Sequence, residues 1–415
     1  MNEIDWRARV SAMRTYPIAL ALGLTVGLLA SAFIWLVVRL KDLLWHQDHW
    51  TYSGFTIFVI CLIGGSLVGV MNYSREKRES RAHDLNEAFA EAENIEKQTL
   101  PSGFSVVRRA VLGVTSLGFG GPLGPEAPLI EIATQMSARL ASILRIAKSD
   151  AVQISVAGSL GALFGAPLAL AGQDSSNSDD TPSRIQKIRL LGPEILAGVV
   201  AFTVFSKLLP GDGFHPYHGA QTTQDFGPGF TALWLTVAAF LATAVALVAH
   251  QGLPHVRSFV TRFIPGGPIG AGVISGAVLG GIAINNPMVL FSGHHEIQQL
   301  LDEEHDVAFL IKIGLLKLLV LTLCLGAGWF GGQIFPMAFI GVAVALSFGQ
   351  IVGSPATLAL AAVGFAAAVT VGVRKPLLSI IFGLLFFPAG TWLPLVLAVA
   401  IAQGLSSNFA HDAAH

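Results

Sequence analysis

The chain has 415 residues, of which 53% are hydrophobic and only 12% are charged, and its formal net charge is −1. Soluble proteins carry about 25% charged residues, so this composition excludes a soluble globular domain. The near-zero net charge gives no indication of a nucleic-acid partner. With a mean hydropathy of +0.64, the chain is expected to cross a lipid bilayer several times.

The first apolar run, Pro17 to Val38, is long enough to span a bilayer, and we interpret it as a helix rather than a signal peptide. Basic residues precede this span and follow the next one, whereas the connection between the two spans has few. The positive-inside rule therefore predicts a cytoplasmic N-terminus. The basic residues are Arg7, Arg9, Arg14, Arg75, Lys77, Arg78 and Arg81.

The apolar runs predict an all-α membrane protein, but several are shorter than the ~20 residues that a spanning helix needs. Many are interrupted by glycine or proline, of which the chain has 45 and 20. Broken and re-entrant helices are tolerated where the backbone is buried in protein or lines a cavity. The predicted segments are 17–39, 54–71, 103–123, 126–144, 151–172, 188–209, 229–250, 266–290, 307–328, 334–352, 355–373, 376–387 and 389–408.

Two pairs of short stretches indicate that the architecture is duplicated. FGAPLALA (164–171) is similar to VRKPLLSI (373–380), and GPEAPLIEIA (124–133) is similar to GQIFPMAFIG (332–341). Both pairs are offset by about half the chain length. In transporters, glycine- and proline-interrupted segments at matching positions of two repeats point to the substrate site.

The repeats divide the chain into three parts within one transmembrane domain, 1–415. The first repeat is predicted over 17–172 and the second over 188–408, and the polar stretch 173–187 is predicted to be a flexible linker. A second polar stretch, 73–100, is predicted to hold a solvated interfacial helix.

The stretch GPLGPEAP (121–128) places a single carboxylate, Glu126, at membrane depth. Pro125 suits the first turn of a helix, where Glu126 would meet unpaired N–H groups and the positive end of the helix dipole. A mobile anion would compete with the carboxylate for these donors, and protonation of Glu126 would remove the competitor. Glu126 is thus a candidate pH-sensitive gate; alternatively, it only stabilises a helix start at the membrane surface.

A second glycine break before a helix, at 331–336, could bring another helix N-terminus to the same site without any basic side chain. The candidate anion-binding residues are therefore Gly124, Pro125, Glu126, Ala127, Gly332, Gln333, Ile334 and Phe335.

Other polar residues have simpler interpretations. Glu131 is either a second functional carboxylate or the partner of a basic group such as Arg139 or one on a neighbouring helix. The run from His294 to His305 favours a solvated connection over a metal site, and no cofactor is expected. Lys312 and Lys317 are expected to snorkel or to be paired inside the bundle. Cys61 and Cys324 are expected to be buried.

Four stretches resemble the signatures of the CLC chloride channels and transporters, in the same order and spacing, most closely a divergent bacterial branch. They are SLGFGGPLGPEAPLIEIA, ALFGAPLALA, GGQIFPMAFIG and RKPLLSIIFGLL. The resemblance implies an inverted-repeat, all-α fold, a homodimer with one pore per subunit, and a location in the bacterial inner membrane. It implies that Glu126 is the external gating glutamate and that N–H groups near Gly124–Ala127 and Ile334–Phe335 bind the anion.

The chain also departs from the family pattern. Where the family has a serine motif that coordinates the anion, residues 83–89 read HDLNEAF. The internal proton-transfer glutamate of the exchangers would fall near Ser176 or Asn177. Asp174, Asp179 and Asp180 are close in sequence, but a solvated loop is the favoured interpretation of these acids. The coordinating tyrosine has no counterpart, Phe409 or His411 being nearest, and no cytoplasmic regulatory domain is expected.

We therefore expect a membrane anion permease, gated by Glu126 and not strictly coupled to protons, rather than an enzyme. The alternative within this class is a proton-coupled antiporter that uses a substitute internal acid. An intramembrane enzyme would need a nucleophile and a base together at membrane depth, and the apolar runs contain almost no histidine or paired aspartate. A structural or receptor-like protein is disfavoured by the duplicated, glycine-broken helices.

Overall fold

The computed structural model describes residues 3–45, 54–76, 85–95, 102–165, 184–210, 216–219, 228–354 and 356–412. Within these ranges the regular structure is helical, apart from one isolated bridge between two glycines, which confirms the predicted all-α class. Six helical segments in this part of the chain are long and apolar enough to cross a membrane. They are Thr15–Trp45, Gly54–Tyr73, Thr231–Phe263, Val307–Gly326, Ile334–Ile351 and Ala389–Ser407.

The chain sorts into two compact units, which we describe separately. The first unit comprises Met1–Leu36, Asn86–Val111 and Glu126–Phe214. The second comprises Val37–Leu85, Leu112–Pro125 and His215–His415. The units are not the two sequence repeats, since part of the first repeat lies in the second unit; the division into repeats stays a prediction.

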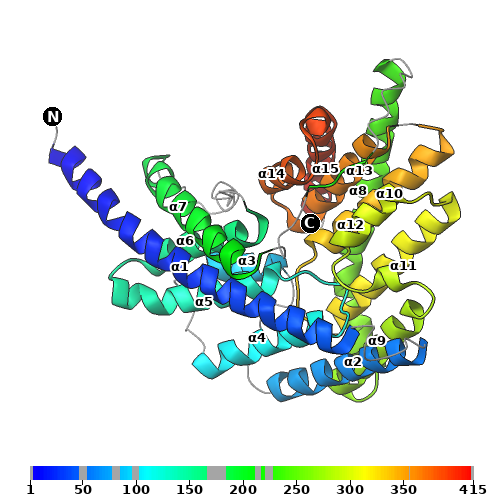
Figure 1. Cartoon of the computed structure of the whole chain (residues 1–415), viewed down its shortest axis with the longest axis horizontal. Coiled ribbons are helices and arrows are strands. Elements are labelled where there is room, and N and C mark those ends of the chain that lie inside the picture. The colour runs from blue at the N-terminus through cyan, green and yellow to red at the C-terminus, as the bar shows by residue number, and fades with distance from the viewer. Residues whose placement is uncertain are drawn as a thin grey trace. The chain divides into compact units, whose positions relative to one another are not determined.

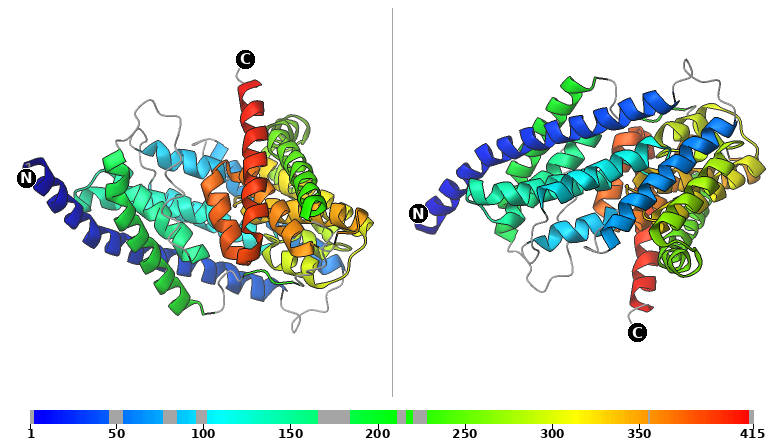
Figure 2. Two further views of the ribbon diagram at one scale, coloured as in Figure 1. Left: turned by 90° about the horizontal axis from the view of Figure 1, so that it is seen from above. Right: turned by 90° about the horizontal axis from the view of Figure 1, so that it is seen from below.

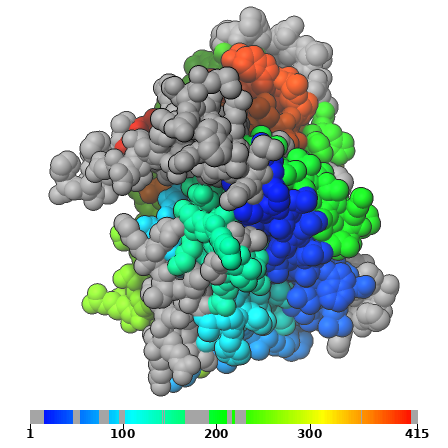
Figure 3. Space-filling model, turned by 90° about the vertical axis from the view of Figure 1, so that its left-hand side faces the viewer, coloured from blue at the N-terminus to red at the C-terminus, as the bar shows by residue number. Residues whose placement is uncertain are grey.

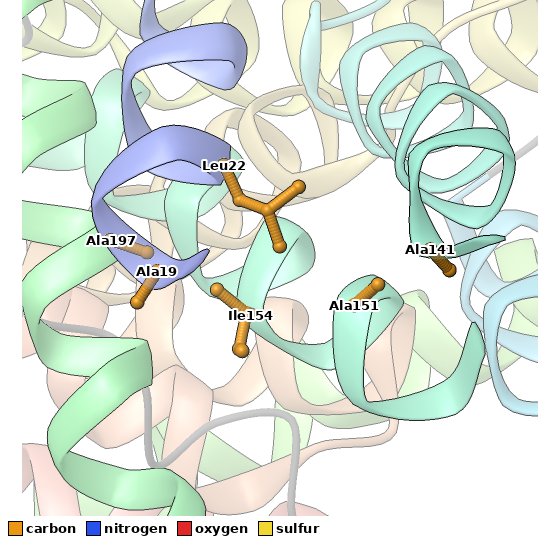
Figure 4. Close-up of a cluster of buried hydrophobic side chains, with 6 residues drawn as sticks. All are labelled: Ala19, Leu22, Ala141, Ala151, Ile154 and Ala197. Atoms are coloured by element: carbon orange, nitrogen blue, oxygen red, sulfur yellow. The ribbon is translucent and has the colours of Figure 1, made fainter. Parts of the chain in front are cut away.

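The first unit is built around small residues. Its helices are the N-terminal part of α1 (Glu3–Trp45), most of α3 (Leu85–Glu93), the start of α4 (Gly103–Gly118), α5 (Glu126–Leu144), α6 (Lys148–Phe164) and α7 (Arg184–Leu208). Figure 4 shows buried side chains from α1, α5, α6 and α7 meeting in one cluster, in which four of the six are alanines. Helices α6 and α7 approach so closely that a Cβ on Gly161 would lie 2.6 Å from Gly198 Cα.

One face of the first unit is apolar and exposed. Figure 3 shows this face, with α1 in blue beside α7 in green. Leu24 and Leu28 of α1 and Val199 and Phe202 of α7 are 38–55% exposed. In water such a surface would be unfavourable, so we interpret it as a surface that faces lipid or another protein chain.

In the second unit, α2 (Gly54–Glu76) packs along α9 (Gly267–Ala283) (Figure 1). Glycines from both helices line the contact, and a Cβ on Gly65 would lie 2.1 Å from the Gly272 carbonyl oxygen. Close backbone approach through small residues is typical of helix pairs in membranes, where lipid offers no hydrophobic drive for association.

The rest of the second unit surrounds α12 (Ile334–Ile351), most of whose residues are buried. Helix α12 contacts α8 (Pro228–Phe263), α11 (Val307–Gly326) and α13 (Thr357–Val373). Figure 2 shows α15 (Trp392–Asp412), in red, running beside α8, in green. The remaining elements are α14 (Pro376–Phe386), α10 (His294–Asp302) and the 3₁₀ turns η3 (Pro287–Val289) and η4 (Ala389–Thr391).

Three predictions from the sequence need correction. Helix α3 falls in the stretch predicted to be solvated, but Ala88 and Phe89 are buried, so one face of it is packed. Helix α8 continues through Pro254 to Phe263, past the predicted end at 250. The His-rich run begins a helix, α10, whose Ile297 and Leu300 are buried. In each case, apolar residues at helical spacing are buried in the structure, although polar neighbours in the sequence obscured this pattern.

Candidate functional site

The two glycine-rich breaks meet in the second unit through their backbones. The Gly124 N–H donates to the Gly332 carbonyl at 2.8 Å, and the Gly332 N–H donates to the Gly124 carbonyl at 2.7 Å. This is the antiparallel bridge noted above. A side chain at Gly331 would prevent the approach, because a Cβ there would lie 2.6 Å from Leu123 Cβ. The structure thus joins the two segments that the sequence singled out.

Each paired glycine lies two residues before the start of a helix. Helix α5 begins at Glu126 and α12 begins at Ile334. Two residues of chain reach at most ~7 Å, so each helix start is tied closely to its glycine. Pro128 and Pro336 are both the third residue of their helices, where a missing N–H removes no intrahelical bond. Pro125 precedes α5 rather than lying in its first turn.

Gln333, the residue before α12, makes one backbone and one side-chain hydrogen bond. The first intrahelical bond runs from the Met337 N–H to the Gln333 carbonyl at 3.0 Å. The Gln333 side-chain amide donates to the Gly372 carbonyl at 2.7 Å. The side-chain amide of Gln333 is thus held by the Gly372 carbonyl, and its backbone lies at a helix end whose dipole favours anions.

Buried polar side chains fix the segments on both sides of the glycine pair. Ser116 Oγ accepts a hydrogen bond from the Phe330 N–H at 3.0 Å. The Trp329 indole donates to Ser275 Oγ at 2.9 Å. Gly121 lies against this ring, since a Cβ on it would be 2.9 Å from Trp329 Cε3. These contacts pack 116–124 against 329–332 without any charged group.

Glu126 and Glu131 are both buried in the first unit, at 0% and 2% exposure. Glu131 forms an ion pair with Arg109 of α4 and accepts a 2.8 Å hydrogen bond from the Gln135 side chain. Of the two interpretations of Glu131, the structure favours a paired carboxylate, and Arg109 is the expected basic group on a neighbouring helix. The ion pair neutralises the Glu131 carboxylate, whose burial without a partner would be costly at membrane depth.

Lys317 of α11 is fully buried, so it does not snorkel. Its ammonium group lies 2.8–3.1 Å from four consecutive carbonyl oxygens, those of residues 288–291. Lys312, on the same helix, is exposed and lies over the Phe309 ring. The buried contacts of Lys317 agree with the expected pairing inside the bundle. The sequence did not identify the partners, because they are main-chain atoms 26–29 residues away.

Tyr217, in the connection before α8, was also missed. Its ring packs against Phe365, Phe386 and Phe387, and its buried hydroxyl has no hydrogen-bond partner among the described residues. Burial, and to a lesser extent the charge of Glu296, raise the pKa of Tyr217 well above 10. The phenol therefore stays neutral at physiological pH.

The remaining candidates lie outside this arrangement. Asp174 falls outside the described residues. His294 Nδ1 lies 3.1 Å from Ser292 Oγ, and its ring is 5.4 Å from the Phe335 ring. Among the described residues, no group of three histidine, cysteine or acidic side chains could hold a metal ion.

Solved structures share the fold over nearly the whole chain. A slow cyanobacterial Cl⁻/H⁺ antiporter superposes with a TM-score of 0.78 at 20% identity, covering 95% of both chains. A CLC-type fluoride/proton antiporter gives a TM-score of 0.77 at 18% identity, covering 98% of this chain and 97% of its own. The predicted CLC-type architecture, an inverted repeat with broken helices, is thereby confirmed.

Comparisons of the sequence agree with these structural comparisons. The chain is 28% identical over 428 residues to the "Putative ion-transport protein YfeO" of Escherichia coli O17:K52:H18, covering 96% of this chain and 94% of the relative. A similar relative from Shigella flexneri is 28% identical over 423 residues. The profile of the family described as "Voltage gated chloride channel" matches residues 64–407. The chain therefore belongs to the voltage gated chloride channel family.

Proposed function

We propose that the protein carries a small inorganic anion, such as chloride or fluoride, across the bacterial inner membrane, with its N-terminus in the cytoplasm. The observation that carries this proposal is the backbone pairing of Gly124 with Gly332, which joins the two glycine-rich segments that precede α5 and α12. The fold relatives named above as Cl⁻/H⁺ and fluoride/proton antiporters support an anion as the substrate.

The proposed anion site consists of main-chain N–H groups within Gly124–Ala127 and Gly332–Phe335. Pro125 has no N–H, and the N–H groups of Gly124 and Gly332 are used by their own pairing, so the donors for the anion come from the remaining residues. Each helix end carries a partial charge of roughly +0.5, which attracts an anion without fixing it. A lysine or arginine in direct contact at low dielectric would hold the anion too strongly for release, whereas conduction needs weak binding.

Glu126 is the proposed gate. It is the first residue of α5, so its carboxylate can reach the donors of its own helix end and compete with a mobile anion there. When the carboxyl group is protonated it no longer competes, so anion flux should rise as the pH falls through its pKa.

We propose that flux is not coupled to protons in a fixed ratio, because the chain has no glutamate at the internal proton-transfer position of the family. A substitute acid, Asp174 or Glu131, is the alternative; the ion pair of Glu131 with Arg109 disfavours the latter. As in the family, we propose a homodimer with one pore in each subunit.

The test is flux from proteoliposomes loaded with chloride or fluoride, with external anion and pH recorded together. We expect valinomycin, which clamps the membrane potential, to release anion from protein-containing vesicles only. Vesicles that retain every anion tried, at pH 4.5 and at pH 7.5, would refute the proposed function.

A further inference from the structure

A strained turn, residues 288–291, contacts the glycine-rich segment 118–124 that precedes the site. Phe291 has φ +54°, a left-handed backbone conformation that is unfavourable for any residue with a Cβ. Its N–H donates to the Gly120 carbonyl at 3.2 Å, and Gly120 itself has φ +87°. Strain of this kind persists only where the surroundings enforce it.

Lys317 supplies the enforcing contacts. An ammonium group has three N–H donors, and four carbonyl oxygens, those of residues 288–291, share them at 2.8–3.1 Å. These carbonyls follow or end the short helix η3, where main-chain acceptors lack intrahelical partners. All the donors of Lys317 are thus engaged by the turn, and none is left to bind an anion directly.

The turn contacts the glycine-rich segment 118–120 directly and through Trp45. The Phe291 ring lies edge-on to Trp45 at 5.3 Å, and the Trp45 indole donates to the Gly118 carbonyl at 2.8 Å. A Cβ on Gly120 would lie 3.0 Å from the Trp45 ring and 3.1 Å from Leu290 Cδ2. The segment 118–120 therefore rests on Trp45, Leu290 and Phe291, four residues before the Gly124–Gly332 pair.

Local stability alone does not explain a lysine at this place. Its ammonium lies 5.3 Å from the centre of the Phe339 ring, beside the second turn of α12. A cation near a helix N-terminus is opposed by the helix dipole, and burial of a charge is costly. An apolar side chain would avoid both costs, but it could not gather four carbonyl groups.

We propose that Lys317 is a positioning residue of the anion site. It holds the 288–291 turn in its strained form and thereby keeps 118–124 in the shape that pairs Gly124 with Gly332. The effect on transport rests on the proposed function, whereas the effect on the shape of 118–124 does not.

Two measurements on Lys317→Met, Lys317→Arg and the matched control Lys312→Met test the proposal. Amide hydrogen exchange of full-length protein in detergent follows residues 118–124 and 287–293. Chloride and fluoride flux from proteoliposomes gives the anion concentration at half-maximal rate. For Lys317→Met we expect at least tenfold faster exchange in both stretches and about tenfold higher half-maximal concentration, with partial recovery in Lys317→Arg. Lys312→Met should match the wild type.

Folded Lys317→Met with wild-type exchange at 118–124 would overturn the proposal, and so would faster exchange with an unchanged half-maximal concentration. A wild type that carries no anion would end the proposed function, while the exchange data would still decide whether Lys317 positions 118–124. If Lys317→Met does not fold, Phe291→Gly takes its place, because glycine accepts φ +54° but removes the ring from Trp45. Faster exchange at 118–124 is then expected, and unchanged exchange counts against the proposal.

Discussion

Two buried carboxylates five residues apart on α5 have different surroundings. Glu131 is neutralised by Arg109 and bonded by Gln135, whereas Glu126 begins the helix, next to the glycine that pairs with Gly332. A carboxylate in a buried ion pair has little freedom to leave it. A carboxylate at a helix start can be replaced there by another anion. We therefore propose that Glu126 is the carboxylate that gates the anion and that Glu131 has a structural role.

Replacement of Glu126 by glutamine should abolish the pH dependence of anion flux. Wild-type flux is expected to rise as the pH falls, because protonation removes the competing charge, and Glu126→Gln should run at the low-pH rate throughout. Flux at a series of pH values in proteoliposomes measures this. Glu304→Gln, at an exposed position before α11, is the control. A variant that keeps the wild-type pH profile would show that another group is the gate.

Removal of one member of the Arg109–Glu131 pair should destabilise the protein by about 3–5 kcal/mol, because the other charge is left buried. Arg109→Met and Glu131→Met should each lower the apparent melting temperature in detergent, and the double variant should recover most of the loss. Losses that simply add in the double variant would mean that the two side chains do not depend on each other.

At the scale of elements, helix pairs in the second unit are held by close backbone contact. Helix α9 presents glycines to α2 at Gly272 and Gly276, where a Cβ would lie 2.2–2.4 Å from carbonyl oxygens of α2. On the same helix, a Cβ at Gly281 would meet nothing within 4 Å. One helix thus offers both a tightly packed and an open glycine.

Gly276→Val should lower stability by about 3 kcal/mol, because neither backbone can move apart without breaking the contact. Gly281→Ala should be neutral or stabilising by up to ~1 kcal/mol, as expected for glycine to alanine in a helix with free space. The measurement is the apparent melting temperature of both purified variants, compared with the wild type in the same detergent. Equal stability of the two would indicate that α2 and α9 are not in close contact in solution.

The sequence predicted the elements whose ends are marked by glycine and proline. The starts of α5 and α12 at Glu126 and Ile334 follow from such glycine and proline residues. The repeat offset also predicted that the two helix starts occupy matching positions in the two repeats. The sequence did not predict α10, because polar residues hide the buried Ile297 and Leu300. It also gave no partner for Lys317, since main-chain carbonyls carry no residue-specific signal.

At the scale of the whole molecule, the fold matches proton-linked antiporters over 95% or more of the chain, whereas no glutamate lies near Ser176, where the family resemblance implies an internal acid. The fold alone therefore does not fix the coupling. The coupling depends on a few side chains along the proton route, and the segment around Asp174 lies outside the described residues.

We predict that an anion gradient does not drive uphill proton movement. In sealed vesicles with an inward chloride or fluoride gradient, the internal pH should stay constant while the anion moves, because in the proposed mechanism no acid relays protons to Glu126. A pH-sensitive dye inside the vesicles measures this. A constant ratio of protons to anions would establish an exchanger, and Asp174→Asn would then be the first variant to examine.

The Gly124–Gly332 bridge has a consequence for how the site can be mutated. Its hydrogen bonds involve only main-chain atoms, and every residue type except proline supplies the same N–H group. Alanine scanning will therefore report steric tolerance at these positions and leave the donors themselves intact. Only atomic editing of the backbone, by replacing a single amide with an ester through semisynthesis at Gly332 or Ile334, deletes one donor at a time.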